Sequence, residues 1–313
     1  MKKLRIWTMG EILVEIMRPS VGIPFDVTGD FRGPFPSGAP AIFIDTVAKL
    51  GHEAGIIGGV GKDGFGKNVL NRLKKDGVNC DYVRVIDGKF TAVAFVSYFD
   101  DGSREFIYHV DGTPATETHD TSKIDVEADC FHVMGCSLMF NKDFAENIIQ
   151  MMKKFHKNGA KVSFDPNIRK ELLSGKNVRE LIEPVLNVTS IFLPGIDEVR
   201  LITGIENEQK AVEYIFENYQ KMEFVVLKKG KSGATVFTKD EKIDIPAYRI
   251  EEVDPTGAGD CFDAAFICGI LEGKTPFEAG KMAAIAGAMN AAAFGPMEGK
   301  ISRKEIEKRL NQL

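Results

Sequence analysis

Cysteine is scarce in this sequence, and its five copies are scattered. They stand at positions 80, 130, 136, 261 and 268, they are odd in number, and no two form a C-x-x-C pair. A disulfide framework needs paired cysteines, and a structural zinc site needs closely spaced ligands. The pattern fits reduced thiols better than either, and we therefore expect a cytoplasmic protein.

Long apolar runs and a strong charge imbalance are also missing. No run reaches the roughly 18 apolar residues of a membrane-spanning helix. The basic start Met1–Arg5 soon meets Glu11 and Glu15, so no signal-peptide core is expected. The net charge is −5 and the pI is about 5.7, which argues against a nucleic-acid surface. We expect neither a membrane nor a nucleic-acid partner.

The composition supports a buried core, and strand and helix patterns alternate along the chain. Of 313 residues, 44% are hydrophobic, enough for one large domain or two. From residue 129 onward the alternation predicts a parallel sheet with helices on both faces. Strands are expected at 130–134, 161–164, 190–193 and 224–227, and helices at 142–157, 178–186, 197–203, 209–219, 260–271, 276–294 and 302–312.

The first third of the chain departs from this regular alternation of strands and helices. One strand is expected at 4–16, loop or a short edge strand at 18–36, and a strand at 54–60 between helices at 39–50 and 66–76. Residues 91–99 and 104–110 are rich in β-branched and aromatic side chains and flank the turn Asp100–Ser103, which predicts a hairpin. With part of 14–35, we interpret this hairpin as a small β-sheet lid.

The segment Val253–Phe266 carries the clearest chemistry. Pro255 and two glycines favour an irregular turn, and the apolar residues that follow have helical spacing, so the turn opens onto a helix N-terminus. Free N–H groups and the helix dipole make such a place an anion site. Asp260 would repel the anion unless it acts as a base on the attacking group; the alternative is that it caps the helix. Phosphoryl transfer to an alcohol needs this combination of base and anion site.

Residues 254–260, Asp-Pro-Thr-Gly-Ala-Gly-Asp, resemble the D-x-T-G-A-G-D signature of the ribokinase-like (PfkB) carbohydrate kinase family, nearest its fructokinase and 2-keto-3-deoxygluconate kinase branch. The resemblance covers nearly the whole chain. It implies an α/β fold, a ribokinase-like three-layer sandwich whose mostly parallel central sheet has helices on both faces, plus a small β-sheet lid. The implied core is 1–13, 36–87 and 113–313, and the implied lid is 14–35 and 88–112.

The same resemblance implies the catalytic groups and the cofactors. Asp260 would be the base, and the amides of Gly257, Ala258 and Gly259 would form the anion hole. ATP and Mg²⁺ are the implied cofactors, with a monovalent cation such as K⁺ near Asp254.

Further stretches resemble the sugar site of the family. Residues 37–40 and 58–66 are similar to its first signature, in which Gly38, other glycines and Asp63 shape the sugar pocket and its floor. Glu15, Arg104 and Tyr108 match sugar-binding positions. Asp165-Pro-Asn-Ile-Arg169 resembles D-x-N-x-R, whose Arg helps to bind sugar or phosphate. Taken alone, an Arg is more often a surface charge than a ligand contact, but the place of Arg169 at the carboxyl end of a strand favours a functional role.

The segments that correspond to the nucleotide and metal sites of the family match its motifs less well. Leu193–Glu198 resembles N-x-x-E, but Gly195 replaces the Asn, so only Glu198 carries over, as a group that holds the water shell of Mg²⁺. The alternative is a simple first-turn charge on a helix. Residues 227–234 resemble the nucleotide loop, where Gly230 and Gly233 would let the backbone approach ATP and Lys228 would lie near the phosphates.

Two other motifs overlap in the glycine-rich stretch Gly58–Gly66. Gly59–Gly64 matches G-x-G-x-x-G, which is typical of dinucleotide binding in a first βαβ unit. Gly61–Lys67 matches much of a Walker A loop, but Asn68 stands where that loop needs Ser or Thr for Mg²⁺. One strand and one helix precede the stretch and no clean acid follows, so we disfavour both interpretations.

Three positions bear on the substrate. Ile42 stands where the family usually has a sugar-binding Asn, and Val110 where its sugar-acid kinases often carry an Arg, while His109 should point to the opposite face of its strand. The planar, charged guanidinium group of Arg169 is suited to bind a carboxylate. We favour an ATP-dependent kinase acting on a terminal hydroxymethyl of a hexose or ketohexose.

Alternatives stay open at this point. A sugar-acid kinase of the 2-keto-3-deoxygluconate type is one. A non-catalytic sugar-binding regulator on the same fold and a nicotinamide dehydrogenase come from other classes. The expected partners are the sugar, ATP and a second copy of the chain, paired through the open edges of the lid sheet.

Overall fold

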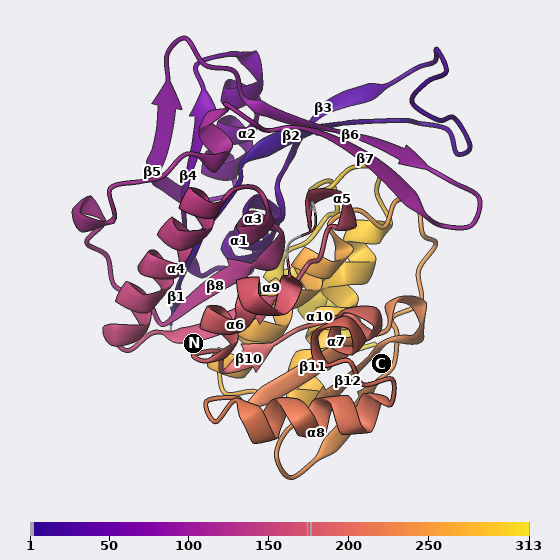
Figure 1. Ribbon diagram of the computed structural model, residues 1–313. Helices are drawn as coiled ribbons and strands as arrows, with labels where there is room; N and C mark the ends of the chain where they lie inside the picture. The colour runs from indigo at the N-terminus through magenta and orange to yellow at the C-terminus, as the bar shows by residue number, and fades with distance from the viewer. Residues whose placement is uncertain (1–2, 174, 176, 313) are drawn as a thin grey trace.

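The computed structural model describes residues 3–173, 175 and 177–312, and these form two sheets (Figure 1). The larger sheet has nine strands in the order β13-β12-β11-β10-β9-β8-β1-β4-β5. From β11 to β5 every neighbouring pair is parallel, whereas β12 and β13 are antiparallel. The strands are β1 (Arg5–Met9), β4 (Glu53–Gly61), β5 (Val78–Ile86), β8 (Cys130–Met134), β9 (Lys161–Asp165), β10 (Ile191–Phe192), β11 (Phe224–Lys228), β12 (Ala234–Phe237) and β13 (Lys242–Ile245).

Helices cover both faces of this sheet, each over its own apolar core. One face carries α1 (Ala39–Lys49), α2 (Gly64–Lys75), α9 (Ala258–Leu271), α10 (Pro276–Ala291) and α11 (Arg303–Leu310). The other carries α4 (Lys142–Lys157), α6 (Val178–Leu186), α7 (Ile196–Thr203) and α8 (Glu208–Asn218). The short helices α3 (Gly135–Met139) and α5 (Lys170–Leu173) follow β8 and β9, and the 3₁₀ turns are 114–116, 121–123 and 230–232. The three-layer prediction is confirmed.

The smaller sheet has the order β3-β2-β6-β7 and projects from one end of the molecule (Figure 1). Its strands are β2 (Leu13–Met17), β3 (Arg32–Ser37), β6 (Ala92–Tyr98) and β7 (Arg104–His109). β6 and β7 form the predicted antiparallel hairpin, and β3 is an edge strand. We call these four strands the lid sheet.

The prediction of one strand over 4–16 is wrong. The chain leaves the larger sheet after Met9 and joins the lid sheet at Leu13. Gly10 allows this break, because a Cβ there would lie 2.4 Å from Cγ of Pro40 and 2.6 Å from Oγ of Ser137. Burial on both sides of the break makes the two strands look like one in the sequence.

Strands β5, β12 and β13 were not predicted. β5 is an edge strand whose exposed and buried positions partly alternate, and β12 and β13 are only four residues each. Weak or short alternation carries little signal. None of the helices in the described part of the chain has the length and apolar character needed to span a bilayer.

Candidate active site

The turn before α9 is built by backbone geometry and one buried carboxylate. Gly257 is the N-cap, with φ 76°, and a Cβ there would lie 2.4 Å from the carbonyl oxygen of Pro296. Asp254 Oδ1 accepts from the Thr256 N–H (3.0 Å) and Oδ2 from the Gly295 N–H (2.9 Å). No side chain caps the helix, so its first N–H groups stay available for an anion, and the capping interpretation of Asp260 is wrong.

Asp260 lies in the first turn of α9 and is 6% exposed. Its Oδ1 accepts a hydrogen bond from Asn167 Nδ2 (3.2 Å). Burial raises the pKa of Asp260 to about 7, the nearby Asp165 carboxylate adds to this, and the Arg169 and Lys228 cations oppose it. A carboxylate whose pKa lies near neutral is suited to accept a proton from an alcohol.

The loop after β9 brings Asn167 to Asp260. Asn167 has φ 39°, a left-handed conformation that Asn tolerates, and its N–H donates to Asp165 Oδ1 (3.0 Å). The next amide, of Ile168, donates to Glu198 Oε1 (2.7 Å). The sequence did not predict this role for Asn167, although its place in the D-x-N-x-R motif is the signal that could have indicated it.

Lys228, at the carboxyl end of β11, lies beside the same turn. Its Nζ contacts Asp165 Oδ2 (2.8 Å) and both oxygens of Asp263 (3.1 and 3.2 Å), and it is 3.9 Å from the position a Cβ of Gly259 would take. Burial would lower the pKa of Lys228, but the two carboxylates hold it above its ordinary value. A fixed positive charge therefore lies next to the anion turn.

A pocket opens over Asp260 between the large sheet and the lid sheet. Its lining includes six of the predicted residues, namely Glu15, Gly38, Arg104, Tyr108, Arg169 and Gly257, together with Asp260 itself. Gly38 is required there, because it has φ 104° and a Cβ would lie 2.4 Å from the carbonyl oxygen of Glu11. The structure thus brings together residues from the two sheets and from both ends of the chain.

Two buried glutamates line this pocket. Glu15 Oε1 accepts from Ser37 Oγ (2.8 Å), whereas Oε2 has no hydrogen-bond partner within the described residues. Burial raises the pKa of Glu15 to about 7. Glu11 accepts from Ser137 and Cys136, and burial raises its pKa as well. Glu11 was not predicted as a site residue, since its partners are more than a hundred residues away.

The lid contributes alternate residues of β7. Arg104, Phe106 and Tyr108 face the pocket, and the guanidinium carbons of Arg104 and Arg169 lie 5.7 and 5.3 Å from the Phe106 ring centroid. His109 is exposed on the opposite face, as predicted. Val110 does not line this pocket; it is buried in a small apolar cluster, so its side chain contributes no wall to the pocket.

The glycine-rich stretch from the end of β4 into α2 does not line this pocket. Asp63 caps α2 by accepting from the Gly66 N–H (2.8 Å) and also accepts from the Thr91 N–H (2.7 Å). A Cβ on Gly61 would lie 2.3 Å from the Lys89 carbonyl oxygen. These residues join α2 to the base of the lid, and neither the dinucleotide nor the Walker interpretation is supported.

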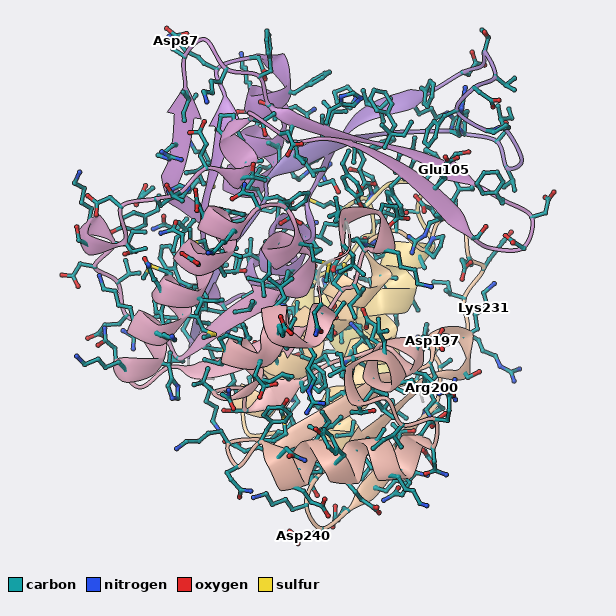
Figure 2. The ribbon with its side chains drawn as sticks, viewed as in Figure 1. Asp87, Glu105, Asp197, Arg200, Lys231 and Asp240 are labelled. Carbon is teal, nitrogen blue, oxygen red and sulfur yellow. The ribbon has the colours of Figure 1, made fainter. Side chains whose placement is uncertain are left out.

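Two predicted nucleotide residues, Gly230 and Gly233, lie at the turn between β11 and β12. Gly233 has φ 90°, and a Cβ there would lie 2.1 Å from the Ile245 carbonyl oxygen, so packing alone requires this glycine. Gly230 begins the 3₁₀ turn after β11, and Lys231 in that turn projects into solvent (Figure 2). Both oxygens of Glu198 accept backbone N–H groups, from Gly195 and Ile168 (2.7 Å each). Within the described part of the chain, no group of three or more Asp, Glu, His or Cys side chains is arranged to bind a metal ion directly.

Comparisons with known proteins agree with this geometry. Residues 34–302 match the pfkB family carbohydrate kinases. Fructokinase-1 of Oryza sativa is 29% identical over 315 residues, covering 96% of both chains. A crystal structure of an E. coli protein assigned as ribokinase II, in complex with ATP and Mg²⁺, is 38% identical with a TM-score of 0.89, over 99% of this chain and 100% of that one. A Vibrio cholerae fructokinase bound to fructose, ADP and calcium shares the fold, with a TM-score of 0.82 at 21% identity, over 97% and 98% of the two chains.

The sequence match, the two sheets and the buried Asp260 carboxylate beside an uncapped helix N-terminus agree, and the chain belongs to the pfkB family of carbohydrate kinases, which are sugar phosphotransferases.

Proposed function

We propose that this protein transfers the γ-phosphoryl group of ATP to a terminal hydroxymethyl group of a neutral hexose or ketohexose. The observation that carries the proposal is Asp260, a buried carboxylate with a pKa of about 7, in the first turn of an uncapped helix and in the wall of a pocket. The relatives named fructokinase support a ketohexose as the substrate. The ATP bound to the E. coli neighbour supports ATP as the phosphoryl donor.

In this proposal each group has one task. Asp260 accepts the proton of the attacking hydroxyl, and Asn167 holds its carboxylate in place. The amides of Gly257, Ala258 and Gly259 stabilise the charge that develops on the transferred group. Lys228 adds a positive charge beside them. Glu15, Arg104, Tyr108 and Arg169 orient the sugar, with Gly38 leaving room for it.

We propose that Mg²⁺ enters with the nucleotide and meets the protein through water. The carboxylates near the turn are already engaged: Asp165 and Asp263 contact Lys228, and Glu198 binds two amides. Glu198 remains the residue proposed to hold the water shell, and a bound Mg²⁺ would neutralise phosphate charge. Gly230 and Gly233 are proposed to flank the nucleotide, and a K⁺ ion is proposed near Asp254.

A sugar acid is the second candidate, because two arginines, Arg104 and Arg169, face the pocket. Against it, three carboxyl groups, Glu11, Glu15 and Asp260, line the same pocket. The test measures kcat/KM for fructose, other neutral hexoses and 2-keto-3-deoxygluconate on one preparation, with ADP release as the readout. We expect fructose or another neutral hexose to lead. A tenfold or larger preference for the acid would overturn the neutral-sugar assignment.

We also propose the wider arrangement expected from the sequence. The lid over the sugar site comprises 14–35 and 88–112, and the core comprises 1–13, 36–87 and 113–313, of which residues 1, 2, 174, 176 and 313 lie outside the described residues. Two copies pair through the outer face of the lid sheet, where Ile107 is 39% and Phe31 is 40% exposed. All five cysteines are free and buried, which fits the proposed cytoplasmic location.

A further inference from the structure

The lid hairpin reaches the anion turn through one tyrosine. The Tyr98 hydroxyl lies 3.0 Å from Asp254 Oδ1 and 3.1 Å from Thr256 Oγ1. Arg104 NH1 lies 3.5 Å from the same threonine oxygen. Asp254 and Thr256 are the first and third residues of the motif that ends in Asp260, so the lid touches the segment that shapes the anion site.

The directions of these hydrogen bonds are determined. The Asp254 carboxylate is 1% exposed and can only accept, so the Tyr98 hydroxyl donates to it. The Tyr98 oxygen then accepts from the Thr256 hydroxyl, whose oxygen is left to accept from Arg104. Burial and the adjacent Asp254 carboxylate both raise the pKa of Tyr98, which keeps its proton in place.

The sugar-facing groups and Tyr98 belong to one continuous sheet. Tyr98 pairs with Arg104 across the hairpin, and β6 also pairs in parallel with β2, which carries Glu15. Glu15 and Arg104 both line the sugar pocket. A sugar held by Glu15 and Arg104 would therefore contact the same sheet that presents the Tyr98 hydroxyl to Asp254.

We propose that Tyr98 is a positioning residue that couples sugar binding under the lid to the geometry of the anion turn. The inference rests on the proposed phosphoryl transfer at Asp260. Tyr98 touches neither reactant in this account; it holds Asp254 and Thr256, and through them the amides of residues 257–259. Its loss should leave the lid docked, because the Phe35 and Phe294 rings still meet at 5.7 Å between the lid and the Gly295 loop.

The test uses Tyr98→Phe, which removes only the hydroxyl. Tyr219→Phe is the matched control, since that hydroxyl also binds a carboxylate, Glu183 (2.9 Å), in a part of the molecule outside the pocket. Binding of a non-hydrolysable ATP analogue is measured with and without saturating sugar. In wild type the sugar should tighten the analogue's Kd by about tenfold, within the usual range of coupling between sites. In Tyr98→Phe this factor should fall to nearly one, and kcat should drop by about tenfold while the sugar KM changes less.

Two results would overturn the inference: a coupling factor and kcat in Tyr98→Phe that match those of wild type and Tyr219→Phe, or a wild-type protein whose sugar leaves the analogue's Kd unchanged. A wild-type protein that turns over no sugar would count against the proposed function instead. In that case the energetic coupling between Tyr98 and Asp254 is tested by the melting temperatures of Tyr98→Phe, Asp254→Asn and the double variant. We expect the double variant to lose clearly less than the sum of the single losses, and strict additivity would overturn the link.

Discussion

Asp260 shows how the surroundings of one residue move its pKa toward neutrality. Burial disfavours the ionised form of Asp260 and the Asp165 carboxylate repels it, so both raise the pKa. The Arg169 and Lys228 cations stabilise the ionised form and lower the pKa in part. The balance leaves the pKa at about 7, whereas an exposed aspartate titrates near 4. A base with that pKa is both ionised to a useful extent at neutral pH and strong enough to accept a proton.

Replacing Asp260 with Asn should therefore lower kcat by roughly 10²–10⁴-fold without loss of fold. Because the carboxylate must be ionised to act, wild-type kcat should fall as the pH drops below about 7. That limb of the profile should be missing in Asp260→Asn. Kinetics over the pH range on the best sugar, with circular dichroism as the folding control, check both. A variant that keeps more than about a third of wild-type kcat would show that Asp260 is not the base.

Asp45 of α1 is a second buried carboxyl with a raised pKa, and it lies outside the site. Its Oδ2 is 2.6 Å from Lys49 Nζ, and burial raises its pKa to about 7 despite that cation. Between the unfolded and folded pKa values the folded protein holds a proton that the unfolded chain has released. The free energy of unfolding therefore falls as the pH rises from about 4 to about 7, and levels off above.

Asp45→Asn should remove this contribution. The difference in unfolding free energy between about pH 5 and about pH 8 should shrink by about 2–3 kcal/mol. Urea unfolding at both pH values measures it, with Asp240→Asn as the control, because Asp240 is exposed at the far end of the molecule (Figure 2). An unchanged difference in the Asp45 variant would mean that this carboxyl titrates normally in the folded protein.

At the scale of elements, the connection from β4 to α2 resembles a nucleotide loop but joins structural parts. Asp63 caps α2 and binds the Thr91 amide at the start of the lid hairpin. Glycines on both sides of this connection, Gly59 and Gly61 in β4 and Gly66 in α2, are needed because neighbouring backbone lies within 2.4 Å of their Cβ positions. Tight packing of chain against chain and cradling of a phosphate call for the same residue, which explains the overlapping motifs.

Lys67→Ala and Asp63→Ala separate the two roles. Lys67 is exposed on α2, so its removal should leave kcat and the ATP KM nearly unchanged. Loss of Asp63 should lower the free energy of unfolding by about 1–3 kcal/mol, because a helix cap and a buried amide lose their acceptor. Steady-state kinetics and denaturant unfolding measure these effects. Impaired nucleotide binding in a folded Lys67→Ala protein would revive the Walker interpretation.

At the scale of the whole molecule, the lid sheet has one face over the site and one face open. Alternation along β7 places Arg104, Phe106 and Tyr108 over the pocket and Ile107 on the open face. The outer edges of its edge strands β3 and β7 have no strand partner within the described chain. The open face presents the apolar Ile107 between Glu105 and His109, and an exposed sheet face with open edges is suited to pair with a second copy.

We expect wild type in solution at twice the chain mass of 34.5 kDa. Ile107→Glu should shift it toward the monomer, because a buried charge at an apolar interface is costly. Leu201→Glu is the control: Leu201 lies on α7 and is 53% exposed, yet stands away from the lid. Sedimentation velocity distinguishes the species, and a wild-type monomer would contradict the lid pairing.

The sequence by itself determined the features that depend on neighbouring residues. The anion turn, the start of α9 and the alternation of strands and helices all arise within short stretches, because backbone hydrogen bonding, glycine conformation and side-chain periodicity act locally. The tertiary structure alone decided which distant groups meet. Asn167 reaches Asp260 across 93 residues, and Tyr98 reaches Asp254 across 156. It also left Asp63 and Val110 out of the lining of the pocket over Asp260, because the order of strands and the packing of the lid decide which side chains face a cavity, and no local pattern encodes that order.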